Sequence, residues 1–203
     1  MDFKEIFFGI FASLFIVLRR FIFLIVRPYR TLRKISLEKD YWQLFIILFF
    51  VFIYFWLSSL VRNPAVHFIF IYLLFLINFF LTAIFFFFMG RLSNKKLEVK
   101  SFLFTLAYSL LPTIVWFFTD LIFYSLLPPP RTTSIMGRSF SIFFTTLSIS
   151  LLAWKLILFY LAIRFSTRFN FYRTIYSIIL YVCWFFPYSV FLYYLKLFRI
   201  PFI

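Results

Sequence analysis

The chain has 203 residues, of which 65% are hydrophobic and 28% are aromatic, and its formal net charge is +15. A soluble domain of this length could not enclose so much apolar surface in one core, so lipid must cover the remainder. In a soluble protein this charge would favour nucleic acid as a partner. Here the basic residues lie between apolar runs, so they indicate an anionic lipid surface and no nucleic acid.

Residues 1–40 combine apolar runs with basic residues. Ile6 to Leu18 is apolar but short for a membrane span, Arg19 and Arg20 interrupt the run, and Phe21 to Val26 is apolar again. We expect this region to form an amphipathic helix that lies in the cytoplasmic interface, or that enters the leaflet and returns.

A basic stripe follows this apolar stretch. Arg27, Arg30, Arg33 and Lys34 recur at three- and four-residue spacing, which places them on one face of a helix. We expect these side chains to contact lipid phosphates. The alternative for the apolar residues before the stripe is a sixth span, from Phe3 to Val26.

Five further segments each offer about 20 predominantly apolar residues, the length needed to cross a bilayer. The predicted spans cover residues 41–61, 65–89, 102–127, 140–163 and 174–195. The connection around Asn63 and Pro64 is very short, which predicts a tight antiparallel hairpin. The sequence therefore predicts an all-α fold, a polytopic membrane helical bundle with five transmembrane helices in residues 41–203.

The distribution of basic residues predicts the orientation of this bundle. Fifteen of the 21 Lys and Arg residues fall on one side of the five spans, five fall on the other, and Lys155 lies within a span. Because cytoplasmic loops are enriched in Lys and Arg, we expect a multi-pass protein of the cell membrane. Its N-terminus would be cytoplasmic and its C-terminus extracytoplasmic.

Asp120 and Lys155 are the formal charges well inside the predicted spans. Charges are costly in hydrocarbon, so such residues are candidates for function. The two belong to neighbouring antiparallel helices and lean toward each other, which allows a stretched salt bridge. The functional interpretation is an ion- or proton-coupled element. The structural interpretations are an ion pair that fixes helix register and a lysine that extends to the interface.

Groups suited to catalysis are scarce. The chain has six acidic residues, one histidine and one cysteine. It contains no HExxH motif, no glycine-rich phosphate loop and no GxSxG motif. We therefore expect no enzymatic activity, no catalytic residue, no metal site and no cofactor.

Two prolines lie inside predicted spans, at Pro112 and Pro187. Each removes a backbone hydrogen bond and is expected to kink its helix. At Pro112 the kink could join a shallow helix to a shortened crossing from Thr113 to Leu127.

Two segments carry a family resemblance: RPYRTLRKISLEKDYW at residues 27–42 and GRLSNKKLEVKSFLFTLAYSLLP at residues 90–112. These runs resemble the Yip family of integral membrane proteins, named for interaction with Ypt/Rab GTPases, in its prokaryotic form. The residues that match its signature are Gly90, Tyr108, Ser109 and Pro112. The resemblance covers residues 20–185 and implies five spans, the same orientation and a role in membrane organisation.

This sequence also departs from the family pattern. Ala107 replaces the glycine that often precedes the signature tyrosine. The long cytosolic segment through which eukaryotic members engage GTPases has no counterpart in this sequence.

The sequence thus predicts a non-enzymatic Yip-like protein that acts in membrane organisation or as a scaffold. Its expected partners are the lipid bilayer, anionic phospholipid, and other membrane proteins or a second copy of the chain. The alternative is a small ion- or proton-coupled transporter that uses Asp120 and Lys155.

Overall fold

The computed structural model describes residues 3–38, 40–62, 67–93, 97–127 and 135–195, and every regular element in these ranges is an α-helix. The helices, in chain order, are α1 (Phe3–Val26), α2 (Pro28–Ile35), α3 (Tyr41–Arg62), α4 (Phe68–Ser93), α5 (Val99–Ser109), α6 (Leu111–Leu126), α7 (Ile135–Thr167) and α8 (Phe171–Tyr194).

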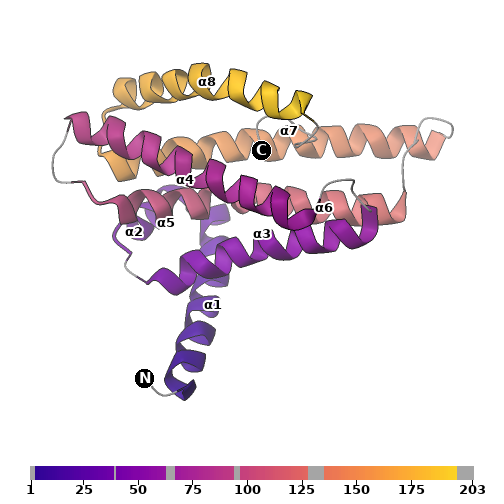
Figure 1. The fold of residues 1–203 in the computed structure, drawn as a ribbon, viewed down its shortest axis with the longest axis horizontal. Coiled ribbons are helices and arrows are strands. Elements are labelled where there is room, and N and C mark those ends of the chain that lie inside the picture. The colour runs from indigo at the N-terminus through magenta and orange to yellow at the C-terminus, as the bar shows by residue number, and fades with distance from the viewer. Residues whose placement is uncertain (1–2, 39, 63–66, 94–96, 128–134, 196–203) are drawn as a thin grey trace.

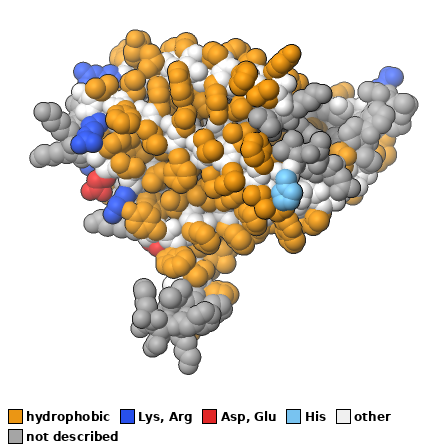
Figure 2. All heavy atoms as spheres, viewed as in Figure 1, with side chains coloured by type: hydrophobic (Ala, Val, Ile, Leu, Met, Phe, Trp, Pro, Cys, Tyr) orange, Lys and Arg blue, Asp and Glu red, His pale blue; other side chains and the backbone are white. Residues whose placement is uncertain are grey.

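Within the described residues, six segments are long and apolar enough to cross a membrane: α1, α3, α4, the α5–α6 pair, α7 and α8. Figure 2 shows hydrophobic side chains covering the middle of the visible face, with Lys and Arg side chains mainly at one end. Exposing so extensive an apolar surface to water would be energetically unfavourable. The chain is therefore an integral membrane protein, and the predicted all-α polytopic helical bundle is confirmed.

The long helices other than α1 share one direction in Figure 1, with α5 and α6 packed against α3, α4 and α7. The α5–α6 pair forms the centre of the bundle and contributes many of its fully buried side chains, among them Phe104, Ala107 and Tyr108. These pack with Ile47 of α3 and Leu158 of α7. The outward faces of the surrounding helices are left for lipid to cover.

The five predicted spans correspond to α3, α4, the α5–α6 pair, α7 and α8. The largest difference is α7, which begins before the predicted residue 140 and continues past residue 163. Asn63 and Pro64, where we expect the tight hairpin turn, lie outside the described residues.

The predicted break at Pro112 is confirmed. α5 ends at Ser109, and Pro112 lies in the first turn of α6, where its missing N–H costs little. The two helices nevertheless follow one another along the bundle direction in Figure 1, so the crossing is broken but keeps its length. Pro187 lies within α8, which continues through it as one helix.

α1 differs from the expectation that Arg19 and Arg20 interrupt it, because it is one continuous helix of 24 residues. Both arginines have local partners: Arg20 forms a salt bridge with Glu38, and the Arg19 guanidinium lies over the Phe23 ring. Length and hydropathy alone would let α1 cross a membrane. Figure 1 shows it running across the direction of the other long helices, near the end of the bundle that carries α2.

Candidate functional site

The predicted basic stripe lies on α2 and the residue before it. Arg27, Arg30, Arg33 and Lys34 are all exposed. The opposite face of α2 is buried through Thr31, Leu32 and Ile35. α2 is thus attached to the bundle by its apolar face and presents its basic face outward.

Aromatic packing fixes α2 against the end of α7. The Tyr29 and Phe165 rings meet edge to face, with their centroids 4.8 Å apart. A hollow of about 400 Å³ borders the start of the helix, between the Arg27 and Arg30 side chains. The stripe is therefore a surface on a packed helix with room for small anionic groups.

Other basic side chains extend this surface. Figure 1 places α2 at the same end of the bundle as the end of α4 and the start of α5. The junction of α7 and α8 lies at this end as well. The further exposed basic residues of these segments are Arg91, Lys100, Arg168 and Arg173. We call the surface formed by these four residues and the α2 stripe the basic end.

The expected pair of Asp120 with Lys155 is not formed. The Asp120 carboxylate instead accepts a hydrogen bond of 2.6 Å from Arg62, the last residue of α3. The same guanidinium lies over the Tyr124 ring, 4.6 Å from its centroid. Asp120 therefore joins α6 to the end of α3. Arg62 lies just beyond the predicted span at residues 41–61, beside the short connection around Asn63 and Pro64, so the sequence pattern does not indicate it as a partner of Asp120.

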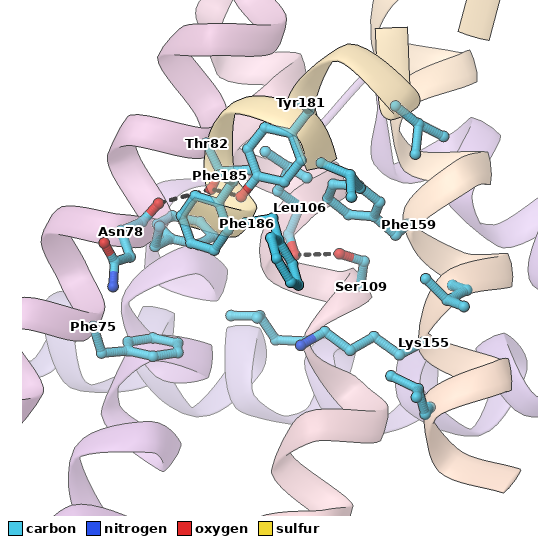
Figure 3. Close-up of a pocket in the computed structure, with 16 residues that line it drawn as sticks. Phe75, Asn78, Thr82, Leu106, Ser109, Lys155, Phe159, Tyr181, Phe185 and Phe186 are labelled. Carbon is cyan, nitrogen blue, oxygen red and sulfur yellow. Dashed lines mark hydrogen bonds between the residues drawn. The ribbon is translucent and has the colours of Figure 1, made fainter. Parts of the chain in front are cut away.

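Lys155 has no salt bridge and no hydrogen bond within the described residues. Its side chain lines a pocket of about 340 Å³ whose walls come from α4, α5, α7 and α8. Figure 3 shows Lys155 reaching from α7 toward α4, with Asn78 and Phe75 on the opposite wall. Nothing in the sequence pattern indicates a role for Asn78, a single amide inside an apolar run.

The four hydroxyl residues that most closely precede Lys155 on α7 do not form a polar path toward it. Thr145, Thr146, Ser148 and Ser150 each donate a hydrogen bond of 2.8 to 2.9 Å to the carbonyl four residues earlier. Ser148 also accepts from the indole N–H of Trp116 on α6. These hydroxyls are therefore satisfied by the backbone of α7, and among them Ser148 also links α7 to α6.

Two residues of the predicted family signature lie where helices meet most closely. Tyr108 is 0% exposed and donates a hydrogen bond of 2.7 Å to the side-chain oxygen of Gln43 on α3. The Arg20 guanidinium of α1 donates to the same oxygen at 2.6 Å and lies over the Tyr108 ring. Gly90 lies at the contact of α4 with Leu97, Phe102 and Thr167.

The other two signature residues have local roles. Ser109 donates to the Leu106 carbonyl and lines the same pocket as Lys155. Pro112 is buried at the start of α6. Tyr108 and Gly90 thus lie at contacts between helices, whereas Ser109 and Pro112 lie at the junction of α5 and α6.

The acidic side chains beside α1 are also held by partners. Glu38 pairs with Arg20. Asp40 accepts hydrogen bonds from Ser13 at 2.5 Å, from the Gln43 side chain at 3.1 Å and from the Trp42 backbone N–H at 3.1 Å. In the part of the chain that the structure describes, no three potential metal ligands cluster.

No family model matches the chain, and no curated protein or solved structure is significantly similar to it.

Proposed function

We propose that the chain is a non-enzymatic, Yip-like membrane protein that binds anionic phospholipid through its basic end and organises membrane through helix–helix contacts. The observation that carries this proposal is the α2 stripe, in which four exposed cations stand on a helix whose other face is buried. Basic groups beside an anionic leaflet each contribute about 1 kcal/mol of attraction.

The basic end would face the cytoplasm. Cytoplasmic loops carry the excess of Lys and Arg, and fifteen of the 21 basic residues lie on this side of the five bundle spans. In this orientation α1 would lie in the cytoplasmic leaflet with the N-terminus inside. The bundle would then make five crossings, with the C-terminus outside.

A scaffold role is supported by how the acidic groups are used. Glu38, Asp40 and Asp120 each hold two helical segments together or cap one, as the salt bridges and hydrogen bonds above show. Each of these carboxylates therefore already has a structural role, which supports a scaffold. The transporter alternative relies on a pair between Asp120 and Lys155, but Asp120 instead forms a salt bridge with Arg62.

The test replaces Arg27, Arg30, Arg33 and Lys34 together by glutamine. The variant and the parent protein are reconstituted in nanodiscs that mix anionic and zwitterionic phospholipid, and the bound lipid is measured by native mass spectrometry. We expect the variant to lose most of its bound anionic lipid, and the parent to lose the same lipid as salt is raised.

A matched control removes the same number of charges elsewhere on the basic end: Arg91, Lys100, Arg168 and Arg173, also changed to glutamine. We expect this control to retain more anionic lipid than the α2 variant. Equal retention by the α2 variant and the parent protein would refute lipid binding by α2. Equal loss in both variants would show a diffuse electrostatic attraction with no site on α2.

A further inference from the structure

The pocket beside Lys155 opens toward the lipid-facing surface. Its walls are largely aromatic and aliphatic, as Figure 3 shows. Leu152 and Leu156 of α7 and Val182 and Phe186 of α8 line it and are themselves strongly exposed. An apolar molecule in the bilayer could therefore enter between α7 and α8 without passing through water.

Most polar groups of the pocket are already satisfied by one another. The Tyr181 and Thr82 hydroxyls are 2.8 Å apart, and the Thr82 hydroxyl also donates to the Asn78 backbone carbonyl at 2.8 Å. Tyr181 must then be the donor to Thr82, since each hydroxyl has one hydrogen. These two groups leave no hydrogen-bonding demand for a ligand to meet.

Two polar groups of the pocket remain available. The Lys155 ammonium has three donors and, within the described residues, no acceptor. Asn78 is 8% exposed, and its side-chain oxygen is buried without a hydrogen-bond partner. Both residues line the same pocket, Asn78 from α4 and Lys155 from α7, and Figure 3 shows the Lys155 side chain extending into it.

A bound anion would stabilise an unpaired ammonium at this depth. Lys155 lies twelve residues before Thr167, the end of α7, which corresponds to about 18 Å along a helix. A cation inside hydrocarbon is costly unless an opposite charge or a polar group compensates it. No acidic residue lines the pocket, so a negative charge that compensates Lys155 within the pocket would come from a ligand.

We infer that this pocket binds the carboxylate of a single-chain lipid, a long-chain fatty acid, with Lys155 as its counter-ion. Lys155 is the one charged residue among the pocket's lining residues, so it matches a single negative charge better than a phosphate, which carries more. The volume of about 340 Å³ is near the lower limit of ligand pockets. It therefore suits one acyl chain better than two.

Asn78 would help to orient the carboxyl group of the fatty acid. An amide can present its NH₂ group to the carboxylate after rotation of the side chain, or its oxygen to the proton of the neutral acid. The acyl chain would lie along Phe159 and Phe185 and leave between the exposed leucines of α7 and Val182 of α8. This site lies between the spans, away from the α2 stripe, so it does not depend on lipid binding at the basic end.

The test uses a sixteen-carbon fatty acid that carries a diazirine on its chain, added to the purified full chain in nanodiscs. We expect photolabelling of peptides from α7 and α8. Unlabelled palmitate should compete for the site. Lys155→Gln should weaken competition by about tenfold or more, because a charge-assisted hydrogen bond is lost, and Lys155→Arg should retain it.

Chemical controls distinguish the contribution of the carboxylate charge from that of the acyl chain. The methyl ester of palmitate has the same chain without the charge, and we expect it to compete poorly with the parent protein. Lysophosphatidate tests the phosphate alternative. The carboxylate assignment is overturned if the ester competes as well as the acid, if lysophosphatidate competes better, or if Lys155→Gln binds as tightly as the parent.

Two further variants protect the test against a folding defect. Arg19→Gln removes an exposed cation outside both the pocket and the basic end and should leave competition unchanged. Leu156→Trp narrows the opening without altering Lys155 and should reduce photolabelling several-fold. If Leu156→Trp keeps its thermal stability and is labelled as strongly as the parent protein, the fatty acid does not occupy this pocket.

Discussion

The Arg62 guanidinium on α3 and the Asp120 carboxylate on α6 are joined by a hydrogen bond of 2.6 Å in a partly buried site. Arg62 is the last residue of its helix, whereas Asp120 lies six residues before the end of α6. The position of the Arg62 guanidinium over the Tyr124 ring adds a cation–π contact to the pair.

Breaking this pair is expected to destabilise the bundle. Arg62→Gln or Asp120→Asn should each lower the free energy of unfolding by about 1.5–3 kcal/mol, because each leaves a charged partner partly buried. The double variant should lose less than the sum of the two. Unfolding in mixed detergent measures all three, with Arg173→Gln as the exposed control. Additive losses would show that the two residues act independently.

The crossing helices could be predicted because bilayer thickness fixes their length and charged residues mark their ends. The break at Pro112 followed from the missing backbone donor. Side-chain partners could not be predicted in the same way. The pattern predicts a turn at Arg62 and an interruption of the apolar run at Arg20, yet each side chain pairs with an acidic residue.

The pocket could not be predicted from the sequence either. Asn78 and Lys155 are 77 positions apart, and periodicity identifies neighbours on one helix but not the helices that face each other. A charged residue in a membrane span is energetically costly, and this alone marks Lys155 as a candidate in the sequence. The other residues around it come from α4, α5 and α8, which only the structure shows to lie beside α7.

Gln43 is expected to be the most sensitive residue of the contact between α1, α3 and α5. It is 1% exposed, and its side-chain oxygen accepts from both Arg20 and Tyr108. Gln43→Leu should cost about 1–3 kcal/mol by leaving two buried donors without their acceptor. Tyr108→Phe removes one neutral donor and should cost about 1 kcal/mol.

Both variants can be measured by detergent unfolding, with Tyr176→Phe as the exposed control. If Tyr108→Phe costs as much as Gln43→Leu, the shared acceptor is not what holds this contact together.

The orientation of α1 can be measured directly. Spin labels at Phe8, Phe15 and Ile22 would occupy exposed positions along the helix, in a Cys183→Ser background. If α1 lies along the leaflet, all three should show similar depth by power saturation with oxygen and a nickel chelate. In a crossing helix, Phe8 and Ile22 would differ by about 20 Å. Such a difference would show a sixth span and place the N-terminus on the other side.

Gly90 and Gly9 offer a matched pair of helical glycines with opposite expectations. A Cβ at Gly90 would lie 2.7 Å from the Leu97 side chain and 3.2 Å from the Phe102 ring, whereas nothing lies within 4 Å of a Cβ at Gly9. Gly90→Ala should therefore destabilise the protein by about 1–3 kcal/mol through overpacking. Gly9→Ala should be neutral or stabilising by up to about 1 kcal/mol, because alanine favours helix. Thermal unfolding in detergent compares the two, and a stabilised Gly90→Ala protein would mean that Leu97 moves aside at little cost.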